Sequence, residues 1–415
     1  MRPLSLVCLF MLAQALNVSG ETQNAASQTE LIQALMTRVE QLEKRIAELE
    51  ASKPTPPATP PTNIQTASME GMQIVSPAGA SEGRPNLNLA GFGDFNFGAT
   101  DQPGSHSGFN EGQFILHLNS NLSPKVSFMG EVSFTARADA GIGSPAAAGF
   151  NAEVERSIVR FAHNDHLKVS FGRYHTPVNY WNTAFHHGQW LQTTVSRPEM
   201  IQFGGRFIPV HFVGALVEGA TGANGLNFNY NVGVGNGRGS VISRGGDAGD
   251  NTNGRAWLVN MFVRPDKLYG LQMGGSAYRD TVTTGGRDYR EWITSTHIVW
   301  NRENPEIIGE FANVRHQNLT NAAAPIANSQ AYYVQAGYRL PVLNKQFKPY
   351  YRFEYIHVPR SDTMFQPMSN LAGSVAGLRY DLSSFAALKF EYRNQRRAKD
   401  QPHINGAFVQ TSFTF

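Results

Sequence analysis

One stretch of the sequence, residues 173–209, concentrates side chains that could bind a ligand or take part in a reaction. It reads RYHTPVNYWNTAFHHGQWLQTTVSRPEMIQFGGRFIP. Its guanidinium, imidazole and aromatic groups belong to Arg173, His175, Tyr180, Trp181, His186, His187, Trp190, Arg197 and Arg206. A connection of this length is usually functional or disordered, and its density of aromatic residues argues against disorder. We therefore predict that residues 176–209 form a loop that constricts a channel and presents cations and imidazoles to solutes.

Other interpretations of this loop remain open. His175, His186 and His187 could bind a metal, but adjacent histidines point in different directions and no carboxylate pattern accompanies them, so we predict no metal and no cofactor. Alternatively, the loop folds outward and packs on a neighbouring subunit. A hydrolase triad can be drawn from Ser196, His186 and Asp165, but no nucleophile motif surrounds any serine. We therefore predict that the protein is not an enzyme.

The segments that must position this loop are short alternating strands. In residues 125–138, KVSFMGEVSFTARA, valine and phenylalanine alternate with lysine, serine, glutamate and arginine. Residues 331–340 and 385–395 repeat the pattern, with charges in mid-strand and Phe or Tyr on the other face. This pattern is typical of a closed barrel with lipid outside and water inside, because closure pairs every backbone group. The predicted fold class is an all-β transmembrane antiparallel β-barrel.

We count sixteen strands in residues 86–415. They are 86–98, 112–122, 125–138, 152–163, 167–175, 210–219, 225–236, 255–264, 270–282, 288–300, 305–317, 329–340, 347–358, 370–381, 385–395 and 405–415. Residues 199–208 could add a strand and bring the count to eighteen. The basic residues assigned to the lumen are Lys125, Arg137, Arg339, Lys389 and Arg393. We expect about half of the mid-strand arginines to be merely solvated or paired with acidic neighbours.

Three segments precede the barrel. Residues 1–20 resemble a signal peptide, with a positive start and a short apolar region. Residues 21–51 predict a periplasmic coiled coil whose a and d positions are Ile32, Leu35, Val39, Leu42, Ile46 and Leu49. Residues 52–85 are a proline-rich linker. The only cysteine, Cys8, lies in the signal peptide, which excludes a disulfide scaffold, a thiolate metal site and covalent haem attachment in the mature chain.

The sequence ends in FVQTSFTF, an alternating strand that finishes on an aromatic residue. This ending resembles the C-terminal assembly signal of bacterial outer-membrane proteins, here carried by Phe413 and Phe415. The whole layout, together with FGRYHTP at residues 171–177, resembles the phosphate-selective O and P porins. That resemblance implies a trimeric barrel inserted by the assembly machinery, with anion-selecting roles for Arg173, Arg197 and Arg206. The β-branched a positions of the coiled coil favour a dimer instead.

These features together predict a porin for passive diffusion of small hydrophilic solutes, with a weak preference for anions such as phosphate. We expect it in the bacterial outer membrane, with its N-terminal extension in the periplasm. The net charge of +3 is too small to indicate a nucleic-acid partner. Two alternatives stay open: an envelope anchor whose coiled coil contacts peptidoglycan, and a sheath around a partner electron carrier.

Overall fold

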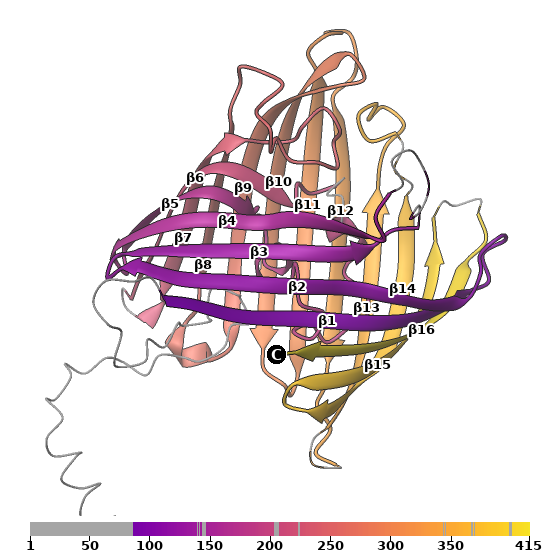
Figure 1. Cartoon of the computed structure of the whole chain (residues 1–415). Coiled ribbons are helices and arrows are strands. Elements are labelled where there is room, and N and C mark those ends of the chain that lie inside the picture. The colour runs from indigo at the N-terminus through magenta and orange to yellow at the C-terminus, as the bar shows by residue number, and fades with distance from the viewer. Residues whose placement is uncertain are drawn as a thin grey trace, which may run out of the picture. The chain divides into compact units, whose positions relative to one another are not determined.

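The computed structural model describes residues 86–415, apart from short gaps at 139, 141, 143–146, 203–206, 223–224, 343, 345, 367, 369 and 398–400. In this part of the chain sixteen antiparallel strands close into one barrel (Figure 1). The strands are β1 (Asn86–Thr100), β2 (Gly108–Ser123), β3 (Val126–Ala136), β4 (Phe150–Asn164), β5 (Leu167–His175), β6 (His211–Thr221), β7 (Phe228–Asn236), β8 (Ala256–Val263), β9 (Leu271–Thr284), β10 (Arg287–Asn301), β11 (Glu306–Asn318), β12 (Ala327–Gly337), β13 (Phe347–His357), β14 (Leu371–Ser383), β15 (Ala386–Arg396) and β16 (Ile404–Thr414).

The predicted barrel of sixteen strands is confirmed. The alternative of eighteen is wrong, because residues Glu199–Ile201 form a short 3₁₀ helix, η2, and not a strand. The predicted signal peptide, coiled coil and linker lie outside the described residues. Among the residues that are described, no helix is both long and apolar enough to cross a membrane.

The barrel closes where β1 lies beside β16, as the first and last colours of Figure 1 show. Gly91 and Phe415 exchange both backbone hydrogen bonds, at 2.9 and 3.1 Å. Gly93 lies opposite Phe413 in the register, and a Cβ added to Gly93 would come within 2.5 Å of the Phe413 ring. An alanine at this position would therefore have to push the Phe413 ring aside.

Alternation along the strands separates an outer from an inner face. In β12, residues 327, 329, 331, 333, 335 and 337 are buried and those between them are exposed. The exposed set includes Tyr332 and Val334, so the outer face is apolar. An apolar outer face around a closed barrel is the arrangement that lipid requires.

The inner face is less polar than the sequence predicted. Leu258, Tyr278, Ile293 and Tyr333 point inward from β8 to β12 and are fully buried. They belong to an apolar cluster that also contains residues of the connection between β5 and β6. The alternation pattern could not show this, because the segment that covers these side chains comes from elsewhere in the chain.

The turns are short at the barrel end where β1 begins and β16 ends, and most connections are longer at the other end. One exception at the far end is the turn between β9 and β10, where Gly285 and Gly286 have φ of 58° and 70°. Two consecutive positive φ values suit a tight hairpin and favour glycine. At the short-turn end, Glu303 pairs with Arg339 and Lys348 at 2.6 and 3.1 Å. Burial alone would raise the pKa of Glu303, but these two cations hold it below its usual value.

Candidate functional site: a cavity beside the inward loop

The connection between β5 and β6 folds into the barrel, where several of its residues join the apolar cluster of the inner wall. It contains the short helix α3 (Trp181–Ala184) and then η2. The Trp181 ring is fully buried and meets Tyr333 of β12 edge-on, with ring centroids 6.0 Å apart. Phe185 packs on the other side of the tryptophan, at 4.8 Å. Loop aromatics on the inner apolar wall therefore hold the first half of the loop in place.

Buried wall carboxylates hold the loop through its backbone N–H groups. The amides of Tyr180 and Trp181 both donate to Oε1 of Glu310 on β11, at 2.7 Å each. The amide of Val195 donates to Glu391 on β15 at 2.9 Å. The N–H groups of an irregular loop have no partners in a helix or sheet, and these carboxylates accept hydrogen bonds from them. This is why an irregular segment can be buried here.

Wall cations hold the loop carbonyls in the same way. Arg379 donates to the carbonyl of Trp190 at 2.7 Å, and Arg352 donates to that of Ser196 at 2.8 Å. Lys389 donates to the carbonyls of Gln189 and Thr194, the latter at 3.1 Å. Of the five basic residues assigned to the lumen, Lys389 does face inward, but its ammonium group holds the loop.

The other four residues of that group lie as follows. Arg393 is on the inner face of β15 and pairs with Glu391 at 2.7 Å. Lys125 lies in the exposed turn before β3, and Arg137 is exposed just after β3. Arg339 follows the end of β12 and pairs with Glu303 and Asp381 at the short-turn end. The last three are thus at strand ends and not in the wall, because β3 begins later and ends earlier than the sequence predicted, and β12 also ends earlier.

Arg197 of the loop does not face a solute path. Arg197 is buried, and it donates to the carbonyls of His186 and Ile201, the latter at 3.2 Å. Burial lowers the pKa of Arg197 to about 9. Arg206 lies outside the described residues. Arg173, on β5, pairs with Glu153 and Asp247 at 3.2 and 2.7 Å.

A cavity of about 120 Å³ lies between the start of the loop and the inner wall of β2 to β9. From the loop it is lined by Pro177, Asn179, Tyr180 and Thr183. From the wall it is lined by Asn119, Ser127, Phe128, Met129, Arg156, Ile158, Arg160, Tyr174, His175, Leu216, Asn231, Asn260, Phe262, Arg264 and Gln272. Of the predicted site residues, His175 and Tyr180 thus border this cavity. Trp181 and Trp190 do not.

The charged residues lining the cavity are all basic. Arg156, Arg160 and Arg264 reach it, and none of the described lining residues is acidic. Arg156 pairs with buried Glu131, and Arg160 pairs with Glu218 at 3.1 Å. Neither carboxylate lines the cavity, so a solute there meets the guanidinium groups first.

Comparisons with known proteins agree with this architecture. No protein-family model matches the chain, and no curated protein matches it in sequence. Among solved structures, an anion-selective porin from Comamonas acidovorans matches with a TM-score of 0.58 at 12% identity, over 80% of this chain and 100% of that chain. The outer-membrane channel DcaP of Acinetobacter baumannii matches at 0.53 and 12%, over 81% and 99%. OmpT of Vibrio cholerae, in a trimer form, matches at 0.51 and 14%, over 80% and 99%. The chain has the fold of the outer-membrane porins.

In this porin fold, the three cavity arginines were missed by sequence reasoning. Arg156 and Arg160 stand four residues apart on β4, so their shared face was readable from alternation. Alternation could not show that Glu155 joins them in the interior, because β4 has a bulge there: Glu131 pairs with Arg156, while the next residue, Val132, pairs with Val154. The extra residue brings both Glu155 and Arg156 to the interior, where strict alternation would place one of them outside.

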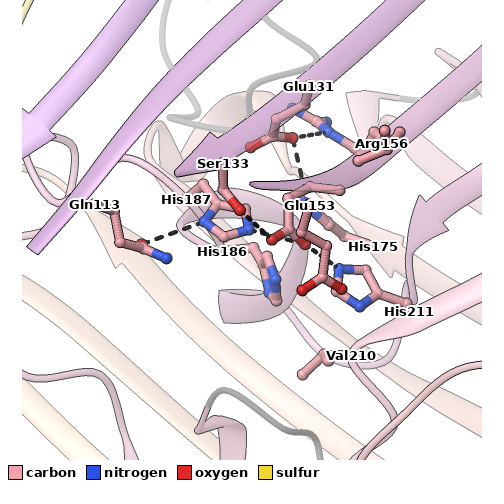
Figure 2. A network of polar contacts seen from close by, with 12 residues as sticks. Gln113, Glu131, Ser133, Glu153, Arg156, His175, His186, His187, Val210 and His211 are labelled. Atoms are coloured by element: carbon pink, nitrogen blue, oxygen red, sulfur yellow. Dashed lines mark hydrogen bonds and ion pairs between the residues drawn. The ribbon is translucent and has the colours of Figure 1, made fainter. Parts of the chain in front are cut away.

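The histidines of the predicted site do come together. His175, His186 and His187 meet near the ends of β5 and β6, and a fourth histidine, His211, joins them (Figure 2). His211 was not predicted as a site residue, but it is the register partner of His175 on the neighbouring strand. Burial, and then the neighbouring histidines, hold the pKa of His186 well below its usual value. This imidazole therefore stays neutral at a pH where an unperturbed histidine would become charged.

Proposed function

We propose that the protein is an outer-membrane channel for passive diffusion of small hydrophilic solutes, with a preference for anions. The observation that carries the proposal is the cavity beside the inward loop, to which Arg156, Arg160 and Arg264 contribute positive charge. A narrow aqueous path between low-dielectric walls focuses the field of such charges on a passing ion. The wall and the loop together select solutes by their position and charge, and no covalent bond is made.

Phosphate is the finer candidate among the anions. A guanidinium group presents N–H donors in a planar fork that fits phosphate oxygens, and three such groups reach one cavity. The predicted resemblance to phosphate-selective porins supports the same solute. Most other charged side chains near the loop bind its backbone. The preference for anions is therefore weak, unlike that of a channel lined by many free basic residues.

We further propose that three barrels associate, that Phe413 and Phe415 direct assembly in the outer membrane, and that residues 21–51 extend into the periplasm. The exposed apolar outer face supports membrane insertion. The trimer form of OmpT supports the oligomeric state by analogy of fold. The same proposal includes a contact between this extension and peptidoglycan.

The test is the reversal potential of single channels across a salt gradient in planar bilayers. Wild type should prefer anions, and Arg264→Gln should shift the reversal potential toward cations. A unit charge acting on an ion about 6 Å away through water contributes about 0.7 kcal/mol, which is about a 3-fold change in relative permeability. Arg264→Lys keeps the charge and should retain the preference.

Lys267→Gln is the matched control, because it removes the same charge from the exposed short helix η4 (Asp266–Leu268) after β8. It should leave selectivity unchanged. An absence of any conductance would refute the channel. Equal selectivity in wild type and Arg264→Gln would refute the assigned role of the cavity.

A further inference from the structure

Four imidazoles converge in the wall of the barrel where β5 ends and β6 begins. The ring centroid of His186 lies 4.0 Å from that of His175, 4.4 Å from that of His187 and 5.0 Å from that of His211. Each of the four histidines offers one ring nitrogen, and these four atoms lie within 4.8 Å of one another. All four side chains are buried.

From this cluster we propose a binding site for one divalent transition-metal ion, with Zn²⁺ the best fit, that clamps the inward loop to the barrel wall. Imidazole is a preferred ligand of zinc and its neighbours in the first transition row. Four ligands at 2.0–2.1 Å in a tetrahedron stand about 3.3 Å apart. Side-chain movements of about 1 Å would bring the four nitrogens to that spacing.

One ligand is oriented by a chain of hydrogen bonds. The side-chain amide of Asn182 donates to the carbonyls of Thr176 and Val210, at 2.9 and 3.0 Å. Its oxygen therefore faces Nδ1 of His186, at 2.8 Å. This places the imidazole hydrogen on Nδ1 and leaves Nε2 as the unprotonated nitrogen, which is the form that binds a metal.

A carboxylate lies beside two of the other histidines. Oε2 of Glu155 lies 3.2 Å from Nε2 of His187 and 2.9 Å from Nε2 of His211. Ser133 donates to the other oxygen of Glu155 at 2.6 Å. Nδ1 of His187 lies 3.3 Å from Oε1 of Gln113, which leaves Nε2, the nitrogen next to Glu155, to bind the ion. A carboxylate beside the ion offsets its charge. The expectation that no carboxylate accompanies the histidine pair was therefore wrong.

His175 supplies an independent observation. Its side chain is buried, and among the described residues neither ring nitrogen has a hydrogen-bond partner. Its Nε2 lies 3.5 Å from Oε2 of Glu131, which is already paired with Arg156. A buried polar group without a hydrogen bond is unfavourable, and a metal ion would satisfy it. His175 also borders the cavity, so the cluster adjoins an unfilled space.

The site would connect three segments of the chain. His175 ends β5, His211 begins β6, and His186 and His187 follow α3 in the loop. A bound ion would therefore hold the middle of the loop against the wall. At a free zinc concentration 100 times the dissociation constant, loop opening that breaks the site should become about 100-fold rarer.

The test uses the full-length protein without a polyhistidine tag, folded in detergent and stripped with a chelator. After equilibration with Zn²⁺, elemental analysis should find one zinc per chain. Co²⁺ should give the intense visible bands of a tetrahedral site. The variant that combines His186→Gln with His211→Gln should bind at least 100-fold more weakly, and Glu155→Gln about 10- to 100-fold more weakly.

The matched control combines His163→Gln with His357→Gln, which removes two exposed histidines outside the cluster. It should bind like wild type. Hydrogen exchange of the loop amides gives a readout that needs no variant, since zinc should slow it in wild type. Less than one zinc per ten chains, equal binding by the cluster variant, or loop exchange unaffected by bound zinc would each overturn the proposal. None of these readouts depends on conductance.

Discussion

Removal of the Glu310 carboxylate should release the inward loop. Glu310 is buried on β11, and its Oε1 accepts the amides of Tyr180 and Trp181 at 2.7 Å each. In Glu310→Ala, both amides lose their acceptor while the tryptophan side chain stays in its apolar site. In Glu310→Gln, an amide oxygen of the same reach remains, and only the charge is lost.

The size of the effect follows from those two bonds. A buried donor left without a partner costs about 1–3 kcal/mol, so two cost about 2–6 kcal/mol. Opening the loop would rehydrate the carboxylate of the wild type, which offsets part of that difference. We therefore expect the lower end, about 2 kcal/mol, which is about a 30-fold rise in the open fraction of the loop. Glu310→Gln should lie between alanine and wild type.

Hydrogen exchange followed by mass spectrometry measures this directly. Peptides covering residues 178–192 should exchange about 30-fold faster in Glu310→Ala, while peptides from β14 to β16 should not change. Asn313→Ala, on the outer face of the same strand, is the control for strand perturbation. If the alanine variant exchanged its loop at the wild-type rate, or if Asn313→Ala had the same effect, the carboxylate would not be what holds the loop.

Three further predictions concern the barrel and its extension. Gly93→Ala should lower the folded fraction measured by heat-modifiable gel migration, because the added Cβ would lie 2.5 Å from the Phe413 ring. Combining it with Phe413→Ala should relieve most of that loss. If the losses of the two variants were additive instead, the steric explanation would be contradicted. The ionised form of Glu303, whose pKa is lowered in the fold, stabilises the barrel above about pH 4.5 and loses this effect as the pH falls below it. The melting temperature should therefore fall less between pH 7 and pH 4 in Glu303→Gln than in wild type, and parallel profiles would show that the pair is not coupled to folding. Deletion of residues 29–50 should leave barrels that still reach the outer membrane, as measured by fractionation, and complete loss of the barrel would rule out an appendage.

The strands of this protein could be predicted closely because two constraints act on every one of them. Lipid outside demands an apolar side chain at every second position, and closure demands that every backbone group be paired. The predicted strand 167–175 matches β5 at both ends, and most other predicted ends fall within three residues of the observed ones. The terminal strand was readable for the same reason, since Phe413 must turn outward if Gln410 and Ser412 turn inward.

The interior was less predictable because its contacts join residues far apart in the chain. Glu310 meets the loop amides across the lumen, and Lys389 meets loop carbonyls from the far wall. Nothing local to either residue distinguishes such an anchor from a charge that faces solutes. The assignment of Arg197 to a solute path failed on the same ground, because only the fold shows that its guanidinium group is enclosed by the loop itself.

The sequence by itself determined a sixteen-strand barrel, its apolar outer face and the one loop rich in histidine, arginine and tryptophan. The tertiary structure alone decided which side chains share a space inside it. The bulge at Glu155 turned two consecutive charged residues inward, and the pairing of β5 with β6 brought His211 to His175. Alternation reports which face a residue is on, but position within the interior depends on register and on loop packing, and these are set by the whole barrel.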